Sequence, residues 1–335
     1  MKGNRVNRKR YRARRNKKSV IILVVTFFIV CAVGLAVKFI PKKDKLNVQV
    51  GTNQEQDKNN GELSESKDNE NKNDFEDKEV ANNEESNTLD NSNYLELKDD
   101  PNADDASMVA ENTKGLLNGT KTYPVRTDGK KVVYLTFDDG PSTTNTPAVL
   151  DVLNQYNVKG TFFVLGNSLE GNEEAQSVLK DIAKEGHAIA NHTYGHNYSY
   201  LYPNRVMNVD NIVSDIEKNN NLMKEILGKD FSTRVIRFPG GYWSWEGRTA
   251  MKDKMIETGY CNIDWNALNK DAEGNAKNAD QLLQSTKETV EALGPNADSV
   301  VLLMHDTYGK EETVKALPQI IEYLQSNGYE FRTIK

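Results

Sequence analysis

Two adjacent carboxylates follow an apolar, β-branched run near the middle of the chain. Asp138 and Asp139 come directly after the letters VVYLTF and before Gly140. Two charged carboxylates at the end of a buried strand cost free energy unless a cation or hydrogen-bond donors pair with them. The alternative interpretation is an ordinary turn after a strand, in which Asp and Gly are common. The pair therefore indicates a cation site only if other suitable residues converge on it.

Three of the four histidines in the chain follow predicted strands. His192 and His196 lie four residues apart in HTYGH, and His305 ends the apolar run LLMH. Two imidazoles at this spacing can bind one metal cation, although the segment lacks the glutamate of the zinc-protease motif HExxH. Taken alone, such a pair is better interpreted as two surface histidines. Together with the aspartates, the histidines would supply ligands suited to a divalent metal.

Arg237 is the third chemically suggestive feature, in the segment RFPGGYW. An arginine in a buried strand needs a carboxylate partner, to which it presents a planar fork of donors. Gly240 and Gly241 would let the backbone approach a ligand closely. A bulge followed by a turn is the alternative interpretation.

The elements that must position these residues form a βα pattern from Lys131 onward. Strands are predicted at Val132–Phe137, Thr161–Leu165, His187–Ala190, Val235–Phe238, Tyr260–Trp265, Val300–Met304 and Glu330–Ile334. Helices are predicted at Pro147–Tyr156, Glu173–Lys184, Val209–Leu227, Arg248–Thr258, Ala279–Leu293 and Glu312–Ser326. This alternation favours a single α/β domain with a barrel-like parallel sheet over two domains. Because the carboxyl ends of barrel strands meet at one face, the polar residues above would come together there.

In this order, the segments resemble the motifs of the polysaccharide deacetylase family, also called the NodB-homology domain or carbohydrate esterase family 4. The resemblance rests on TFDDGPS, HTYGH, an Arg-x-Pro segment and LLMHD, and it covers about residues 130–335. It implies a distorted (β/α) barrel of the NodB-homology type and a divalent metal. Zn²⁺ is the expected ion, with Co²⁺ or Mn²⁺ as alternatives, because ligands of this softness accept several metals.

The resemblance also implies a reaction, the hydrolysis of N-acetyl groups on amino sugars of a cell-wall polysaccharide. The expected substrate is peptidoglycan N-acetylglucosamine, and N-acetylmuramic acid remains an alternative sugar. Chitin oligomers, xylan or an exopolysaccharide are alternative polymers. A barrel that binds wall glycans without catalysis is the competing class of function. Retention of both an acid and a base candidate argues against that class, because binding requires neither.

Individual roles follow from the same resemblance. The implied metal ligands are Asp139, His192 and His196. Three protein ligands leave an open coordination position, as in catalytic zinc sites. Asp138 would act as general base, held by Arg237, and His305 would act as general acid.

Residues on the substrate or oxyanion side are implied less directly: Gly240, Tyr242, Trp265 and Leu303. Many relatives have Tyr directly after the motif proline, where this chain has Gly240, so the wall of the sugar groove is expected to differ. A family carboxylate that tunes the catalytic histidine is assigned to Asp264, in NIDWN, with Asp271 as the alternative.

The N-terminal region carries a strong charge asymmetry. Residues 1–18 contain ten Lys or Arg and no acid, so the chain's net charge of -6 leaves -6 - 10 = -16 for the remainder. The following apolar segment, SVIILVVTFFIVCAVGLAV, is long enough to span a hydrocarbon core of about 30 Å. We expect a basic cytoplasmic tail at 1–18 and an uncleaved transmembrane helix at 19–40. A cleaved signal peptide and a nucleic-acid-binding arm are the weaker alternatives.

The remaining chain is divided by composition. Residues 41–118 are rich in Asn, Asp, Glu, Lys and Ser, and they predict a disordered polar linker. Residues 119–335 are predicted to form the catalytic domain, exported to the outer side of the cell membrane. Cys261 is the only cysteine of that part, so no disulfide framework is expected. The expected partners are the wall glycan and the membrane, with no nucleic acid, and the expected state is a monomer.

Overall fold

The computed structural model describes residues 94–335. The predicted cytoplasmic tail, the predicted transmembrane helix and most of the predicted linker lie outside the described residues. Among the helices that residues 94–335 form, none combines the length and the apolar character that crossing a membrane requires.

A parallel sheet with the strand order β6–β5–β4–β3–β2–β8–β7 forms the centre of the domain, and β9 pairs with β2. The strands are β2 (Val132–Gly140), β3 (Thr161–Val164), β4 (Ala188–Asn191), β5 (Val235–Ile236), β6 (Cys261–Asn262), β7 (Ala267–Leu268), β8 (Ser299–His305) and β9 (Glu330–Phe331). Within residues 94–335, the end strands β6 and β7 do not pair with each other. The sheet is therefore a barrel that is open on one side, in agreement with the predicted distorted barrel.

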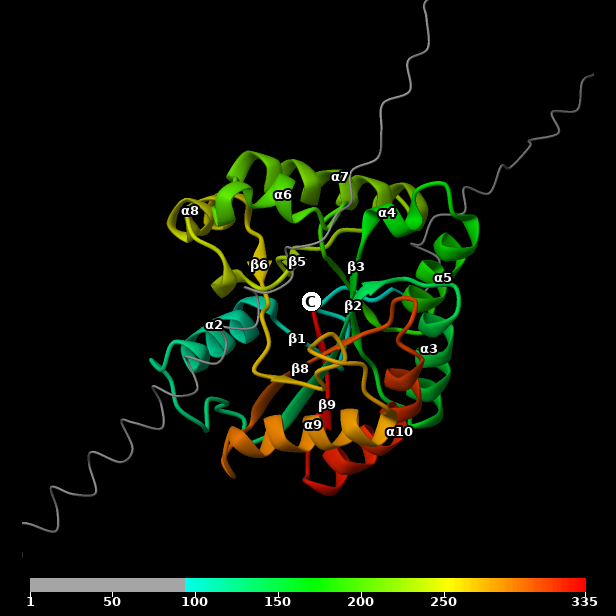
Figure 1. Ribbon diagram of the computed structural model, residues 1–335, viewed down its shortest axis with the longest axis vertical. Coiled ribbons are helices and arrows are strands. Elements are labelled where there is room, and N and C mark those ends of the chain that lie inside the picture. The colour runs from blue at the N-terminus through cyan, green and yellow to red at the C-terminus, as the bar shows by residue number, and fades with distance from the viewer. Residues whose placement is uncertain (1–93) are drawn as a thin grey trace, which may run out of the picture. The chain divides into compact units, whose positions relative to one another are not determined.

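Helices surround this sheet, as Figure 1 shows. The long ones are α3 (Asn145–Gln155), α5 (Glu173–Lys184), α7 (Val209–Leu227), α8 (Arg248–Thr258), α9 (Ala279–Ala292) and α10 (Glu311–Ser326). Short turns of helix are α4 (Gly166–Leu169), α6 (Tyr198–Leu201), η2 (Pro203–Arg205) and η3 (Tyr242–Ser244). All six predicted helices are confirmed, with ends that differ by two residues at most.

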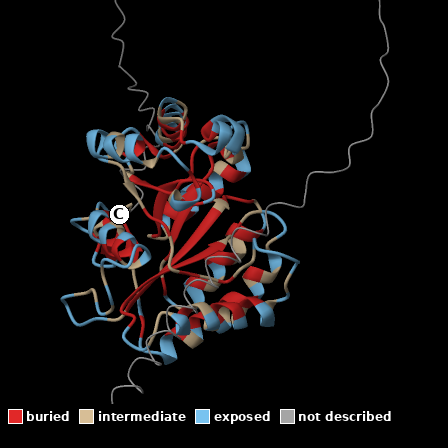
Figure 2. Cartoon of the chain, turned by 60° about the vertical axis from the view of Figure 1, so that its left-hand side comes forward, coloured by how far each residue is buried: buried red, intermediate tan, exposed pale blue. Residues whose placement is uncertain are grey.

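The alternation of side chains along β2 separates two apolar cores. Val133, Leu135 and Phe137 face outward and pack with the surrounding helices. Val132 and Tyr134 face inward, into a second apolar cluster inside the barrel. Figure 2 shows that the strands and the inner faces of the helices are buried while the outer helix faces are exposed. Successive strand residues point to opposite faces, so this pattern also decides which polar residues enter the barrel.

The predicted boundary between linker and domain at Asn118 is wrong. Strand β1 (Ala103–Asp104) and helix α2 (Ala106–Leu117) precede it, and β1 pairs with β10 (Thr333–Ile334). Helix α2 buries Ala106 and Val109 in the inward-facing cluster, and in the ring of helices it lies between α8 and α9 (Figure 1). The Asp105 side chain caps it by accepting from the Ser107 and Met108 amides. This amphipathic helix was not predicted, because its polar outer face resembles the polar composition of the stretch that contains it.

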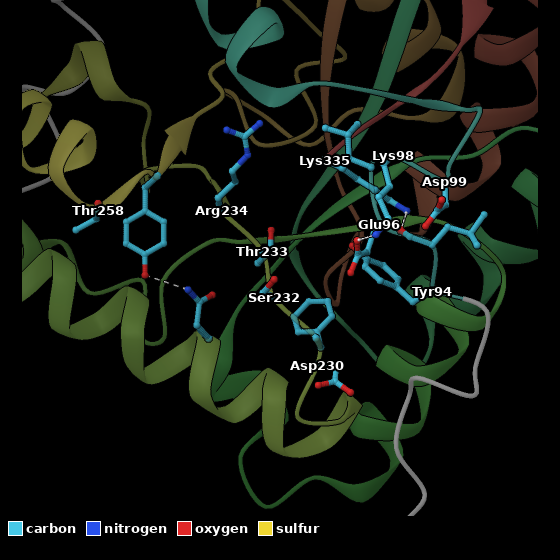
Figure 3. Close-up of a pocket in the computed structure, with 15 residues that line it drawn as sticks. Tyr94, Glu96, Lys98, Asp99, Asp230, Ser232, Thr233, Arg234, Thr258 and Lys335 are labelled. Atoms are coloured by element: carbon cyan, nitrogen blue, oxygen red, sulfur yellow. Dashed lines mark hydrogen bonds and ion pairs between the residues drawn. The ribbon is translucent and has the colours of Figure 1, made fainter.

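Residues 94–100 are held against the opposite end of the barrel from the strands' carboxyl ends, beside the last residue of the chain (Figure 3). The Lys335 ammonium lies 4.4 Å from the Tyr94 ring centroid and 2.7 Å from Asp100 Oδ2. The Tyr94 hydroxyl accepts from the Ile189 amide at 3.3 Å, and burial raises the pKa of Tyr94 to about 12. These contacts make the segment part of the folded domain.

Three predicted strands differ from those observed. The predicted strand Val235–Phe238 is reduced to β5. The predicted strand Tyr260–Trp265 is reduced to β6, and the predicted strand Glu330–Ile334 is divided into β9 and β10, which pair with different partners. Strand β7 has two residues and was not predicted, because so short a pair carries no alternation to detect.

Candidate active site

Strand register brings the predicted site residues to one end of the barrel. Asp138 follows Tyr134 and Thr136 on the inward face of β2, and in the β2–β8 pairing it lies opposite His305. His192 and Arg237 directly follow β4 and β5, two strands that are hydrogen-bonded neighbours. Since all these strands are parallel, their carboxyl ends form the floor of a shared site, as the barrel prediction required.

Asp139 forms the centre of a cluster with metal-ligand geometry. One ligand atom each from Asp139, His192 and His196 lie within 4.8 Å of one another. Asp139 Oδ1 is 3.5 Å from Nε2 of both histidines. This oxygen is buried and accepts no hydrogen bond from any residue in 94–335. A buried carboxylate oxygen without a donor is costly, so the arrangement fits a bound cation.

The protonation of His192 supports the same conclusion. Its Nδ1 lies 2.8 Å from the Arg237 carbonyl oxygen. A carbonyl only accepts, so Nδ1 carries the hydrogen and Nε2 presents a lone pair toward Asp139. Burial lowers the pKa of His192 to about 3, which keeps the imidazole neutral. The His192 Nε2 lone pair and Asp139 Oδ1 are then two acceptors 3.5 Å apart, an arrangement that fits a cation between them.

The loops that carry the ligands adopt an unusual backbone. Asp139 has φ 70° and His196 has φ 49°, both in the left-handed region that non-glycine residues rarely adopt. Asp215 on α7 holds the HTYGH loop by accepting from the Tyr194 and Gly195 amides, each at 2.9 Å. Strained backbone that surrounding contacts impose is typical of functional sites.

Asp138 is paired with a buried cation. Its Oδ1 accepts from Arg237 Nη1 at 2.6 Å, and both side chains are almost fully buried. Arg237 also donates to Thr136 Oγ1 and to the Ile263 carbonyl oxygen, and its guanidinium lies 3.9 Å from the Phe163 ring centroid. Burial raises the pKa of the Asp138 carboxyl, and the charges of Arg237 and His305 counteract part of that rise. A raised pKa brings the carboxylate closer to the range suited to a general base.

His305 is oriented by Asp271, and the assignment of that role to Asp264 is wrong. His305 Nδ1 is 2.7 Å from Asp271 Oδ1, and Thr313 also donates to Asp271. Burial disfavours the charged His305, but the hydrogen bond and charge of Asp271 outweigh it and raise the pKa of His305. Asp264 instead accepts from the Tyr242 amide and from Asn262. The alternative named from the sequence, Asp271, is confirmed as the partner of the histidine.

A pocket of about 240 Å³ contains most of the predicted residues. Those that line it are Asp138, Asp139, His192, His196, Gly240, Trp265, Leu303 and His305. Arg237 lies behind Asp138, and Tyr242 does not line this pocket, because its hydroxyl donates to the Arg248 carbonyl oxygen on α8 and its ring packs near Phe238. Tyr242 is therefore not part of the pocket that holds the other predicted residues.

Tyr198 is a lining residue that the sequence motifs did not indicate. Its ring centroid lies 5.2 Å from that of His196. It stands next to Gly240, whose φ is 75° and whose Cβ, if present, would lie 3.2 Å from the Tyr198 hydroxyl. The positive φ and the crowding by Tyr198 therefore both favour glycine after the motif proline. No signal in the sequence pointed to Tyr198, which comes from the short helix α6.

Comparison with known proteins gives a consistent result. Residues 125–259 match the family described as polysaccharide deacetylase. A peptidoglycan-N-acetylglucosamine deacetylase of Bacillus cereus is 32% identical over 227 residues, which cover 67% of this chain and 77% of that protein. A bifunctional xylanase/deacetylase of Pseudobutyrivibrio xylanivorans is 34% identical, over 68% of this chain and 33% of that protein.

Solved structures agree in fold. The structure of a Streptococcus mutans CE4 esterase superposes with a TM-score of 0.60 and 37% identity, and it covers 68% of this chain and 91% of that one. The catalytic domain of a peptidoglycan N-acetylglucosamine deacetylase from Eubacterium rectale gives a TM-score of 0.54 and 32% identity, with coverage of 65% and 94%. The chain therefore belongs to the polysaccharide deacetylase family, carbohydrate esterase family 4.

Proposed function

We propose that this protein is a metal-dependent hydrolase that removes the N-acetyl group from N-acetylglucosamine in peptidoglycan. The observation that carries the proposal is the arrangement in one pocket of three groups with different chemistry. These are the buried Asp138–Arg237 pair, the His305–Asp271 pair, and the Asp139 oxygen between two histidines, which accepts no hydrogen bond from residues 94–335. Relatives named as peptidoglycan-N-acetylglucosamine deacetylases support the choice of polymer.

Asp139, His192 and His196 would hold a divalent metal, and Zn²⁺ fits two imidazoles and one carboxylate. When bound, such a metal polarises an acetyl carbonyl and makes a nearby water more acidic. Co²⁺ or Mn²⁺ would fit the same ligands.

Proton transfers are assigned to the side chains on either side of this cluster. Asp138 takes a proton from the water molecule that attacks the acetyl carbonyl carbon. Arg237, 2.6 Å away, keeps the carboxylate in place. His305 gives a proton to the amide nitrogen as the carbon–nitrogen bond breaks, because an amine leaves poorly as an anion. Acetate and a free glucosamine amine are the products.

The negative charge that develops on the acetyl oxygen requires a donor. We assign this role to the backbone N–H of Gly240, which lines the pocket. The glycine contributes its amide without a side chain that would fill the space next to Tyr198. Trp265 and Leu303, which also line the pocket, would contact the sugar.

Acetate release from purified peptidoglycan tests this function. Three samples are compared: metal-loaded protein, chelated protein, and metal-loaded Asp138→Asn. We expect release only from the first. Metal binding without acetate release from any wall polymer would instead support a glycan-binding barrel. Release from chitin oligomers or acetylated xylan, and none from peptidoglycan, would contradict the polymer.

We also propose that residues 19–40 anchor the protein in the cell membrane, with the N-terminus cytoplasmic and the deacetylase domain outside. The support is the uncharged run Ser19–Val37, which follows ten basic residues, together with a substrate that lies outside the membrane. Protease treatment of intact protoplasts checks this orientation. The domain should be digested while an N-terminal epitope tag is protected, and protection of both ends would contradict the proposal.

A further inference from the structure

A second hollow lies beside the active-site pocket, between helices α2 and α8. This groove has a volume of about 700 Å³. Leu117 on α2, Trp243 at η3 and Ile256 on α8 line it and expose 43%, 44% and 71% of their surface. Apolar side chains this exposed, gathered along one groove, are typical of a binding surface.

The groove adjoins the catalytic pocket. Asp264 lines the groove, and its chain neighbour Trp265 lines the pocket. Gly241 packs so closely on Trp265 that a Cβ would lie 2.9 Å from the indole. A polymer whose sugar occupies the pocket would therefore have its neighbouring substituents near the groove.

The charge of the groove is positive, in a chain whose net charge is -6. Lys114 on α2 and Lys252 on α8 line it, and neither forms an ion pair with any other residue of 94–335. Arg248 also lines it, and its guanidinium donates to the backbone carbonyls of Trp243 and Trp245 rather than to a carboxylate.

The other charged residues of the groove are neutralised or buried. Glu111 pairs with Lys121 at 2.9 Å, and Arg234 pairs with Asp105 at 2.6 Å. Asp264 is 7% exposed, and it accepts from the Tyr242 amide at 3.1 Å. The three cations on the facing helices are therefore available to an anionic ligand with apolar parts.

We propose that this groove binds the acidic peptide arms of the glycan strand while one of its sugars occupies the catalytic pocket. The inference rests on the proposed function. Peptidoglycan differs from chitin and xylan in carrying short peptides with small apolar side chains and free carboxylates. The exposed apolar surface suits the side chains, and the unpaired cations suit the carboxylates. The groove would thus favour peptidoglycan over polymers without peptides.

The acidic stretch of this chain at residues 42–93, which has more Asp and Glu than Lys, is a competing occupant. Peptide arms are favoured because the groove adjoins the pocket that would hold their sugar. Occupation by the chain itself would inhibit the enzyme. A variant that weakens the groove would then raise activity rather than lower it.

Kinetics with two forms of one substrate test the proposal in the full chain. Soluble peptidoglycan strands are used with their peptides and after an amidase has removed them. The test variant is Lys114→Glu/Lys252→Glu. The matched control is Lys180→Glu/Lys224→Glu, which changes two exposed lysines on α5 and α7. Lys224 lies in the last turn of its helix, as Lys114 does. Co-sedimentation with whole and amidase-treated sacculi is measured for the same proteins.

We expect the test variant to raise KM at least about fivefold on peptide-bearing strands, with kcat unchanged, because two attractions become repulsions. Activity on stripped strands and the control variant should match the wild type. The KM effect should shrink at high salt, where exposed charges are screened.

Each other outcome has a definite meaning. An unchanged KM, an equal change on both substrates, or a gain of activity on both would overturn the peptide-arm proposal. Absence of acetate release by the wild-type protein from either substrate would overturn the proposed function. In that case, peptide-dependent co-sedimentation that the test variant loses would still support the groove as a binding site, and its absence would reject both.

Discussion

The two halves of the active site surround the consecutive aspartates Asp138 and Asp139 with different partners. In the inner half, Asp138 lies inside the barrel with its charge paired to Arg237. In the outer half, Asp139 lies near the mouth between two histidines, and one of its oxygens has no donor among residues 94–335. The charge of Asp138 is balanced within the protein, whereas the surroundings of the Asp139 oxygen fit a bound cation. Neighbours in the sequence can thus hold different roles because a strand turns them to different surroundings.

Removal of the metal from the outer half should give the largest loss of acetate release. We expect chelation to reduce acetate release to background and Zn²⁺ or Co²⁺ to restore it, because the metal supplies the polarisation that no side chain replaces. Activity assays after dialysis against a chelator measure this. Full activity in protein shown by elemental analysis to be free of metal would contradict the assignment.

Breaking the inner half should cost stability as well as activity. Arg237→Met leaves a buried carboxylate without its cation, which costs about 3–5 kcal/mol of the free energy of unfolding. Denaturant titration measures the loss. The control is Arg126→Met, which removes one of the two arginines that pair with buried Asp104 at the other end of the barrel.

Both variants should be less stable, but only Arg237→Met should lose acetate release at a temperature where both remain folded. If the two variants lost the same fraction of activity, the pair of Asp138 and Arg237 would have no specific part in the reaction.

The role of His305 as general acid should appear in the pH dependence of kcat. Asp271 raises the pKa of His305, so Asp271→Asn should lower that pKa. The general acid must be protonated, so the alkaline limb of the kcat profile should move to lower pH, with a loss of about 10–100-fold at neutral pH. An unmoved limb would show that His305 is not the acid or that Asp271 does not tune it.

Asp264→Asn should have the smallest effect of these changes. Asp264 accepts from a backbone amide and from Asn262, and it makes no hydrogen bond to His305. Its replacement should leave the alkaline limb where it is in the wild type. A shift equal to that of Asp271→Asn would return the tuning role to Asp264.

The sequence predicted the parts of this site that are carried by regular strands. Asp138, Asp139, His192 and His305 each follow or end a recognisable apolar run, so the barrel rule alone brought them together. Asp271 follows the two-residue strand β7, which has no detectable pattern, and only the family resemblance offered it as an alternative.

Side chains that depend on irregular backbone were harder to predict. Tyr242 lies in the expected segment, but η3 directs its hydroxyl to the Arg248 carbonyl and away from the pocket. Helix α2 was missed because a cap and a narrow apolar face are weak signals within an Asn- and Asp-rich stretch. The groove it forms with α8 could not be predicted, since it depends on contacts between distant segments.

Metal content and turnover of Asp138→Asn and Asp139→Asn, measured side by side, test the division of roles most directly. The account predicts that Asp138→Asn keeps the wild-type metal content and loses turnover by about 10²–10⁴-fold, as removal of a general base would. Asp139→Asn should lose both. Equal loss of metal in the two variants, or retention of metal by Asp139→Asn, would contradict the account.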